Sequence, residues 1–231
     1  MASKILSNFP RRGGICKLVD RSALFDTRVQ FLTPRMGATS GLSDMELADL
    51  KTKKLATSYA RVADRSLRVV SVYLDEEDKL NEAMLRSSTC TAVQVVNSLK
   101  AKAVEFLIPP LASISAQRAA HVVQQAATLK NYSYFKYITK EDARASLFES
   151  LVVVSNGEVA HSGDLETVCN ATIFARDLAN ERADVASPDY LEEMARAVAA
   201  DTGLGLHVLC LEDLKREGMN LLLAVGQGVC L

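Results

Sequence analysis

The chain has 231 residues, of which 48% are hydrophobic and 24% are charged, and its formal net charge is -1. This composition is typical of a globular protein and excludes an intrinsically disordered chain. No apolar run approaches the roughly 20 residues that a membrane helix needs, so we expect no membrane partner. We expect a cytoplasmic location, with a mitochondrial one as the alternative.

Charge is unevenly distributed along the chain. Residues 1–66 hold 12 Lys and Arg against 6 Asp and Glu, whereas residues 161–231 hold 5 against 12. We interpret this asymmetry as solvated faces. A nucleic-acid-binding arm and a targeting segment are the alternatives.

The cysteines and histidines are too scattered to suggest a metal site. No C-x-x-C pair occurs, and no histidine has a second ligand at metal-binding spacing. The pattern predicts neither a disulfide framework nor a zinc site, and it favours a reducing compartment. These residues are Cys16, Cys90, Cys169, Cys210, Cys230, His121, His161 and His207.

The N-terminal part begins with a basic, acid-poor segment. We predict that residues 1–22 are disordered or targeting-like; a mitochondrial presequence is an alternative, although a proline and two glycines would interrupt its helix. Residues 24–32 predict a first strand and residues 33–43 a loop. Residues 42–63 predict a helix, whose Lys51, Lys53 and Lys54 we interpret as a solvated face and not as a phosphate site.

The middle of the chain alternates strands and helices. Strands are predicted at 67–74, 104–108 and 147–154, and helices at 79–102, from Ser113 or Ser115 to 129, and at 164–180. We interpret the acidic cluster Asp75–Asp78 as a charged first helical turn, with a metal or general-acid role as the alternative. The alternation predicts an α/β domain over 23–160 with a mainly parallel or mixed sheet flanked by helices.

A second part follows this domain. We predict a helical connector over 161–203, in which Ser187 and Pro188 start a helix that ends at Gly203. Beyond it we predict a short strand at 206–209, a short helix at 211–217 and a strand at 221–225.

Three motifs of this second part carry a family resemblance. They are A-R-D-L-A-N at 175–180, S-P at 187–188 and G-M-N-L-L-L-A-V-G-Q-G at 218–228. Their order and spacing resemble the segment that leads into the catalytic domain of the leucyl aminopeptidase family, the two-metal exopeptidases. N-Y-S-Y-F-K-Y at 131–137 also resembles an aromatic packing element of that family.

The resemblance implies a fold for each part. It implies a macro-domain-like N-terminal domain and makes 204–231 the incomplete start of an α/β catalytic domain. Arg176, Asp177, Asn180 and the Gly226-Gln227-Gly228 run are then structural family markers.

The resemblance also implies a chemistry, which is the removal of N-terminal residues from peptides with two divalent metals, zinc or manganese. In that family the ligands come from G-K-G-x-x-F-D-S-G-G and N-T-D-A-E-G-R segments, and neither occurs here. Ser155–Glu158 and Ser162–Asp164 are similar only superficially, because they read as a turn and a helix start. We therefore predict no catalytic, metal-binding or substrate-binding residue, and no bound metal.

The function predicted is that of a leucyl aminopeptidase family member represented by its N-terminal portion and inactive alone. One alternative is a non-enzymatic module for assembly, regulation or nucleic-acid contact, which includes mixed oligomers with a full-length relative. Another is a macro-like domain that binds a nucleotide or ADP-ribose, which rests on fold analogy alone.

Overall fold

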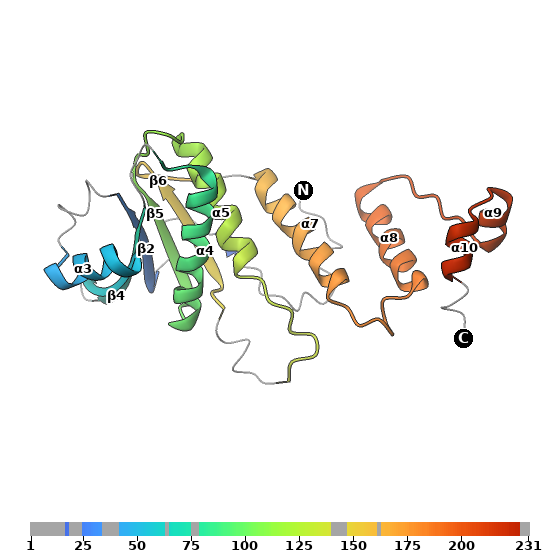
Figure 1. Cartoon of the computed structure of the whole chain (residues 1–231), viewed down its shortest axis with the longest axis horizontal. Coiled ribbons are helices and arrows are strands. Elements are labelled where there is room, and N and C mark those ends of the chain that lie inside the picture. The colour runs from blue at the N-terminus through green and yellow to red at the C-terminus, as the bar shows by residue number, and fades with distance from the viewer. Residues whose placement is uncertain are drawn as a thin grey trace. The chain divides into compact units, whose positions relative to one another are not determined.

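The computed structural model describes residues 17–18, 25–33, 42–62, 65–74, 79–139, 147–160 and 163–226. The described residues up to Ile173 belong to one compact unit, and those from Phe174 onward belong to a second (Figure 1).

The first unit is built on a seven-stranded mixed sheet with strand order β1-β6-β5-β2-β4-β3, and β7 pairs with β6. The central strands run parallel, whereas β3 and β7 run antiparallel to their neighbours. This confirms the predicted α/β fold with a mixed sheet. The strands are β1 Lys17–Leu18, β2 Thr27–Leu32, β3 Leu55–Val62, β4 Arg65–Tyr73, β5 Ala103–Ile108, β6 Ser150–Ser155 and β7 Glu158–Val159.

Two helices cover one face of this sheet. They are α4 (Glu82–Ser98) and α5 (Ala116–Lys130), and the side chains of Asn81 and Ser115 cap their N-termini. Alternate strand residues such as Val70 on β4 pack against these helices, because successive side chains of a strand point to opposite faces. The main hydrophobic core therefore lies between the sheet and the α4–α5 layer (Figure 1).

The opposite face carries a smaller core under α3 (Asp44–Lys53), where Leu50 packs with Leu32 and Ala56. The prediction of one helix over 42–63 is wrong in its second half. Lys54 takes a left-handed conformation with φ 57° and ends the helix, and β3 follows at once. Pairing with β4 along all eight residues of β3 overrides the helical spacing of the apolar side chains.

The remaining helices are α7 (Gly163–Ala179), α8 (Pro188–Thr202), α9 (Leu211–Arg216) and α10 (Asn220–Gly226). Helix α7 agrees with the helix predicted at 164–180, and α9 with the one at 211–217. Among the described helices, none combines the length and apolarity of a membrane span.

Two strand predictions in this region are wrong. Residues 206–209 belong to no strand, and residues 221–225 lie in helix α10. A strand needs a neighbour to satisfy its backbone, and no described strand lies after β7. Leucine and alanine favour the helix, which satisfies its own backbone.

Candidate functional site

The first family marker closes helix α7. The backbone N–H and the side-chain amide of Asn180 both donate to the carbonyl of Arg176, at 2.9 and 2.8 Å. The side-chain amide thus adds a second donor to a carbonyl that the backbone N–H already satisfies, at the end of the helix. Arg176 and Asp177 themselves lie in the last turn of α7.

The turn between α7 and α8 is held by local polar contacts. The Arg182 guanidinium donates to both carboxylate oxygens of Asp184, at 2.9 and 2.7 Å, and these hydrogen bonds lower the pKa of Asp184. The Ser187 side chain then accepts from the Tyr190 N–H at 3.2 Å, and Pro188 occupies the first turn of α8. The predicted start at Ser187 and end at Gly203 are confirmed, since Gly203 caps α8 with φ 73°.

The second unit has very little core of its own. Of its described residues only Met194 is buried. Its exposed large apolar side chains include Leu191, Leu204, Leu206, Leu211, Met219, Leu221, Leu222 and Val225. Contiguous exposed apolar surface of this kind occurs at protein interfaces and also in chains prone to aggregation.

The metal donors of the described residues do not gather into a site. No group of three His, Cys, Asp or Glu side chains able to hold an ion occurs in the part of the chain that the structure describes. One pair of such donors lies at the start of α9, where the Cys210 thiol donates to Asp213 at 3.0 Å and lowers the pKa of that carboxyl. These donors do not fit a site for two divalent cations, which needs several carboxylates converging on ions about 3.5–4 Å apart.

The other residues singled out in the sequence lie far apart along the chain or outside the described residues. His121 lies on α5 and His207 between α8 and α9, while His161, Ser162, Asp75–Asp78 and Gln227–Gly228 lie outside the described residues. Of the described cysteines, Cys90 is half-buried, Cys169 is buried and Cys210 is exposed.

Ser155–Glu158 forms the predicted turn. Asn156 and Gly157 have φ of 52° and 84°, and they join β6 to β7 as a two-residue hairpin loop.

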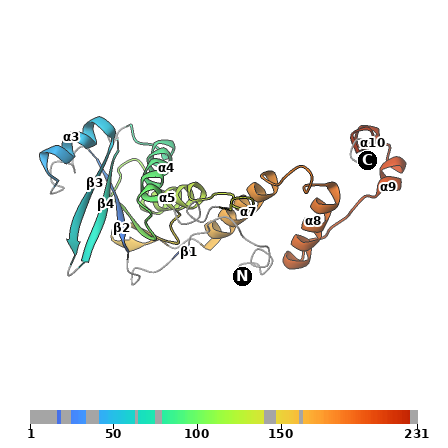
Figure 2. The same cartoon turned by 90° about the horizontal axis from the view of Figure 1, so that it is seen from below.

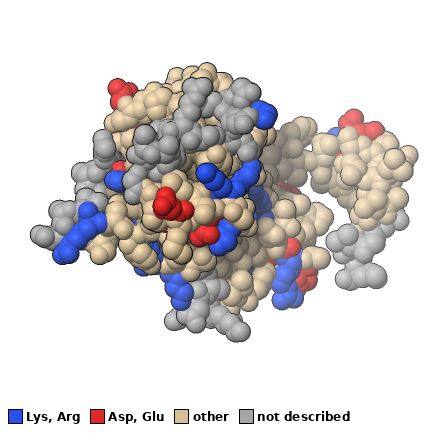
Figure 3. Space-filling view, turned by 60° about the vertical axis from the view of Figure 1, so that its left-hand side comes forward, with Lys and Arg blue, Asp and Glu red and all other residues tan. Residues whose placement is uncertain are grey.

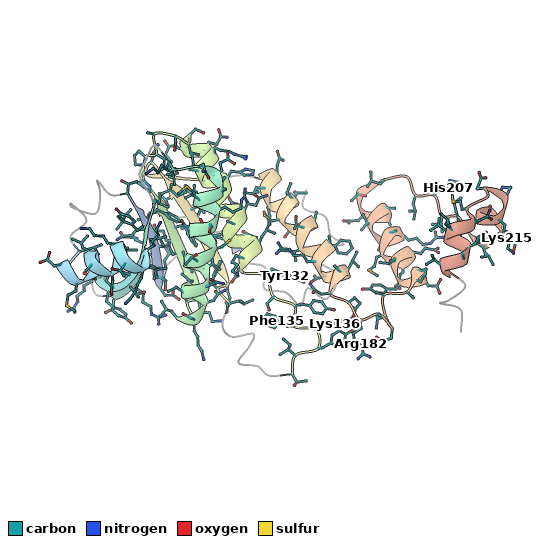
Figure 4. The ribbon with its side chains drawn as sticks, in the orientation of Figure 1. Tyr132, Phe135, Lys136, Arg182, His207 and Lys215 are labelled. Carbon is teal, nitrogen blue, oxygen red and sulfur yellow. The ribbon has the colours of Figure 1, made fainter. Side chains whose placement is uncertain are left out.

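The aromatic segment after α5 is a packing element. Phe135 is buried, and the Tyr134 and Tyr137 ring centroids lie 6.1 Å apart. Lys136, which is labelled in Figure 4, lies over the Tyr137 ring at 5.4 Å from its centroid. The buried Asn131 donates its side-chain amide to the Phe148 carbonyl at 2.9 Å and so joins this segment to the chain before β6.

The lysines at the end of α3 lie on an exposed surface. Lys53 pairs with Asp49 one turn earlier at 3.0 Å, with both side chains largely in solvent. Acidic and basic side chains are mixed on the face that Figure 3 shows, with no broad field of one sign.

One ion pair with a buried carboxylate was not predicted from the sequence. Arg28 on β2 donates to Glu105 on β5 at 2.6 Å, and Glu105 is only 3% exposed. The signal lay in the strand sequences themselves, because each places one charged residue within an otherwise largely apolar run.

Comparison with known proteins finds similarity to cytosol aminopeptidases across most of the chain. Residues 173–230 match the cytosol aminopeptidase family, catalytic domain. A probable cytosol aminopeptidase from Geotalea uraniireducens is 28% identical over 191 residues, which cover 78% of this chain and 37% of that protein. One from Geobacter sp. strain M21 is 31% identical over 166 residues, which cover 70% and 33%. The chain therefore spans about a third of the length of these relatives.

Solved structures show a similar fold at low sequence identity. A leucyl aminopeptidase from Trypanosoma cruzi aligns with a TM-score of 0.60 at 14% identity, over 93% of this chain and 46% of that one. A tomato leucine aminopeptidase aligns with a TM-score of 0.59 at 16% identity, over 80% and 41%. The bottromycin maturation enzyme BotP in complex with Mn aligns with a TM-score of 0.56 at 18% identity, over 78% and 37%.

Proposed function

We propose that this chain, which belongs to the cytosol aminopeptidase family, supplies a non-catalytic portion of that family's architecture and does not hydrolyse peptides by itself. In this proposal 23–160 is the N-terminal domain, 161–203 the connector and 204–231 the start of the catalytic domain. The family name supports peptides as the substrate class of the complete enzymes and the cytoplasm as the location.

The proposal rests on the arrangement of the potential metal-ligating side chains, His, Cys, Asp and Glu, among the described residues. The described residues that match the catalytic domain bring no three metal-ligating side chains together. Two bound cations would activate a water molecule and hold the amino group of the substrate. The described residues supply no such ligand set, so in this proposal they offer neither function.

Activity and metal content together test the proposal. The purified chain, from a host that lacks aminopeptidases, is assayed on leucyl-p-nitroanilide with zinc, manganese or cobalt, beside a full-length cytosol aminopeptidase as positive control. We expect only background hydrolysis and no stoichiometric metal by mass spectrometry after dialysis. Metal-dependent turnover by the purified chain would overturn the proposal.

The sequence of the transcript adds an independent test. The family's G-K-G-x-x-F-D-S-G-G and N-T-D-A-E-G-R segments are sought downstream of the codon for Leu231. Their presence in frame would show that the metal ligands belong to the same gene product, whereas their absence supports a separate non-catalytic protein.

A second candidate function is assembly with a full-length relative. The exposed apolar side chains of α8 to α10 favour it, because these helices lack a core of their own. Co-expression of the tagged chain with such a relative should yield a mixed complex on size exclusion. Substitution of Leu221 and Val225 by Ser should abolish that complex while Met45→Ser, on α3, leaves it intact.

A further inference from the structure

Strand β3 lies at the end of the described sheet. It pairs with β4 on one side through eight consecutive residue pairs, and no described strand lies on its other side (Figure 2). Every second residue of such a strand directs its backbone N–H and C=O outward, where a further strand can bind.

Within β3 itself, several usual protections of an edge strand are missing. The sequence of β3, LATSYARV, contains no proline, and the unbroken register with β4 contains no bulge. Its only charged residue is Arg61. Near the middle of the strand Tyr59 is 71% exposed, which is a large aromatic surface on an open edge.

The strand is also accessible. Strand β4 pairs with β2 only from Arg68 to Tyr73, so the beginning of β4 and the end of β3 continue past β2 as a two-stranded ribbon. Tyr59 pairs with Arg68 where this extension begins.

We propose that β3 pairs with β3 of a second copy of this chain, antiparallel and centred on Tyr59, to form one sheet across a two-fold axis. In this register each Tyr59 lies opposite the Tyr59 of the other copy, and Thr57 lies opposite Arg61. Aromatic pairs stabilise a cross-strand contact, and no like charges oppose each other.

The composition of the strand favours a second copy over a different protein. With no acid and a single arginine, β3 carries no charge pattern that would select a complementary foreign strand. Pairing with itself places the arginine opposite a neutral threonine and closes the open edge of both molecules at once, as a two-fold interface does. The proposal does not depend on the catalytic status of the chain.

Sedimentation velocity over a wide range of concentration tests this association with the full chain. We expect a reversible dimer for the wild type, and for Tyr59→Lys a dimer dissociation constant raised at least about tenfold, because two like charges then oppose each other directly. Met45→Lys is the matched control, since Met45 is 82% exposed on α3. Leu221→Lys tests association through the second unit, and we expect both of these variants to dimerise as the wild type does.

Circular dichroism and thermal melting show whether each variant is folded. A folded Tyr59→Lys chain that dimerises like the wild type overturns the proposal, as does a monomeric wild type. Loss of dimer in Leu221→Lys with retention in Tyr59→Lys also overturns it and assigns the association to the second unit.

Oxidative cross-linking tests the register. Directly opposite residues in an antiparallel pair lie at distances that suit a disulfide. Tyr59→Cys should form a covalent dimer on mild oxidation, at a level that the wild type and Met45→Cys, which have the same native cysteines, do not reach. Failure of Tyr59→Cys to exceed both controls contradicts the register centred on Tyr59.

Discussion

Arg28 and Glu105 form the one ion pair of the described sheet that has a buried carboxylate. Burial of a charge is costly unless an opposite charge and hydrogen bonds compensate it. Arg28 is one-third exposed, so solvent screens the pair and makes it weaker than a fully buried one. Removal of the Arg28 side chain would still leave the buried Glu105 carboxylate without its opposite charge. We expect Arg28→Ala to lower the free energy of unfolding by about 1–3 kcal/mol, measured by urea denaturation.

The double variant Arg28→Leu, Glu105→Leu is the control for this prediction. It removes both charges and leaves apolar side chains in their place, so most of the lost stability should return. A double variant no more stable than Arg28→Ala would show that the loss reflects altered packing and not an uncompensated carboxylate.

Glu82 and Arg118 join the first turns of α4 and α5. The guanidinium donates to both carboxylate oxygens at 2.7 Å, and this hydrogen bonding lowers the pKa of Glu82 from its usual value of 4.5. A carboxyl with a lowered folded-state pKa contributes stability above its unfolded pKa and loses it as the pH falls through the folded value. Because the pair is exposed, the contribution is small and sensitive to salt.

Glu82→Gln should therefore melt slightly below the wild type at neutral pH and low salt. The difference in melting temperature should shrink as the pH falls from 4.5 through the lowered pKa of Glu82, where the folded wild-type carboxyl becomes protonated as well. A pH series of thermal melts measures it. A difference that stays constant down to the acid limit would rule out the ion pair as its cause.

At the scale of elements, the sequence predicted the buried strands well and the short apolar segments poorly. Strands β4 and β5 combine β-branched residues with burial, so local preference and tertiary packing agree. The secondary structure of two segments was predicted wrongly for the same reason: residues 55–62 form a strand instead of a helix, and residues 221–225 form a helix instead of a strand. Each is a short run whose state depends on a neighbouring strand, which β3 has and α10 lacks.

The hairpin between β6 and β7 depends on its glycine. Gly157 has a φ of +84°, and a Cβ there would meet nothing within 4 Å, so only backbone strain opposes a side chain. We expect Gly157→Ala to lower the free energy of unfolding by about 1 kcal/mol, measured by urea denaturation. Gly157→Asn is the control and should lose less, because asparagine tolerates this conformation. An equal loss in both variants would contradict strain as the cause.

At the scale of the molecule, the family assignment and the helix caps at its markers were predictable, whereas the packing of the helices that follow them was not. The markers at 175–180 and 187–188 are local motifs that close one helix and start the next, and such caps are visible in sequence. The exposure of α8 to α10 depends on what packs against them, and no local pattern encodes that. The pairing of Arg28 with Glu105 was hidden for a related reason, since it joins strands 77 residues apart.

The two units should differ in resistance to protease. The unit that ends at Ile173 has a continuous core between the sheet and its helices, whereas Met194 is the only buried residue among 174–226. Cleavage requires local opening, and segments with few buried contacts open at low free energy. Trypsin should therefore cut first after Lys215 or Arg216, which are exposed on α9, and only later within residues 67–155.

Mass spectrometry of a time course with dilute trypsin identifies the order of cuts. The same chain in urea is the control, because once both units are unfolded their lysines and arginines should be cut at comparable rates. If the native chain were cut within β4, α4 or α5 as early as after Lys215, the core of the first unit would open as readily as the exposed helices. The stability difference inferred from burial would then be wrong.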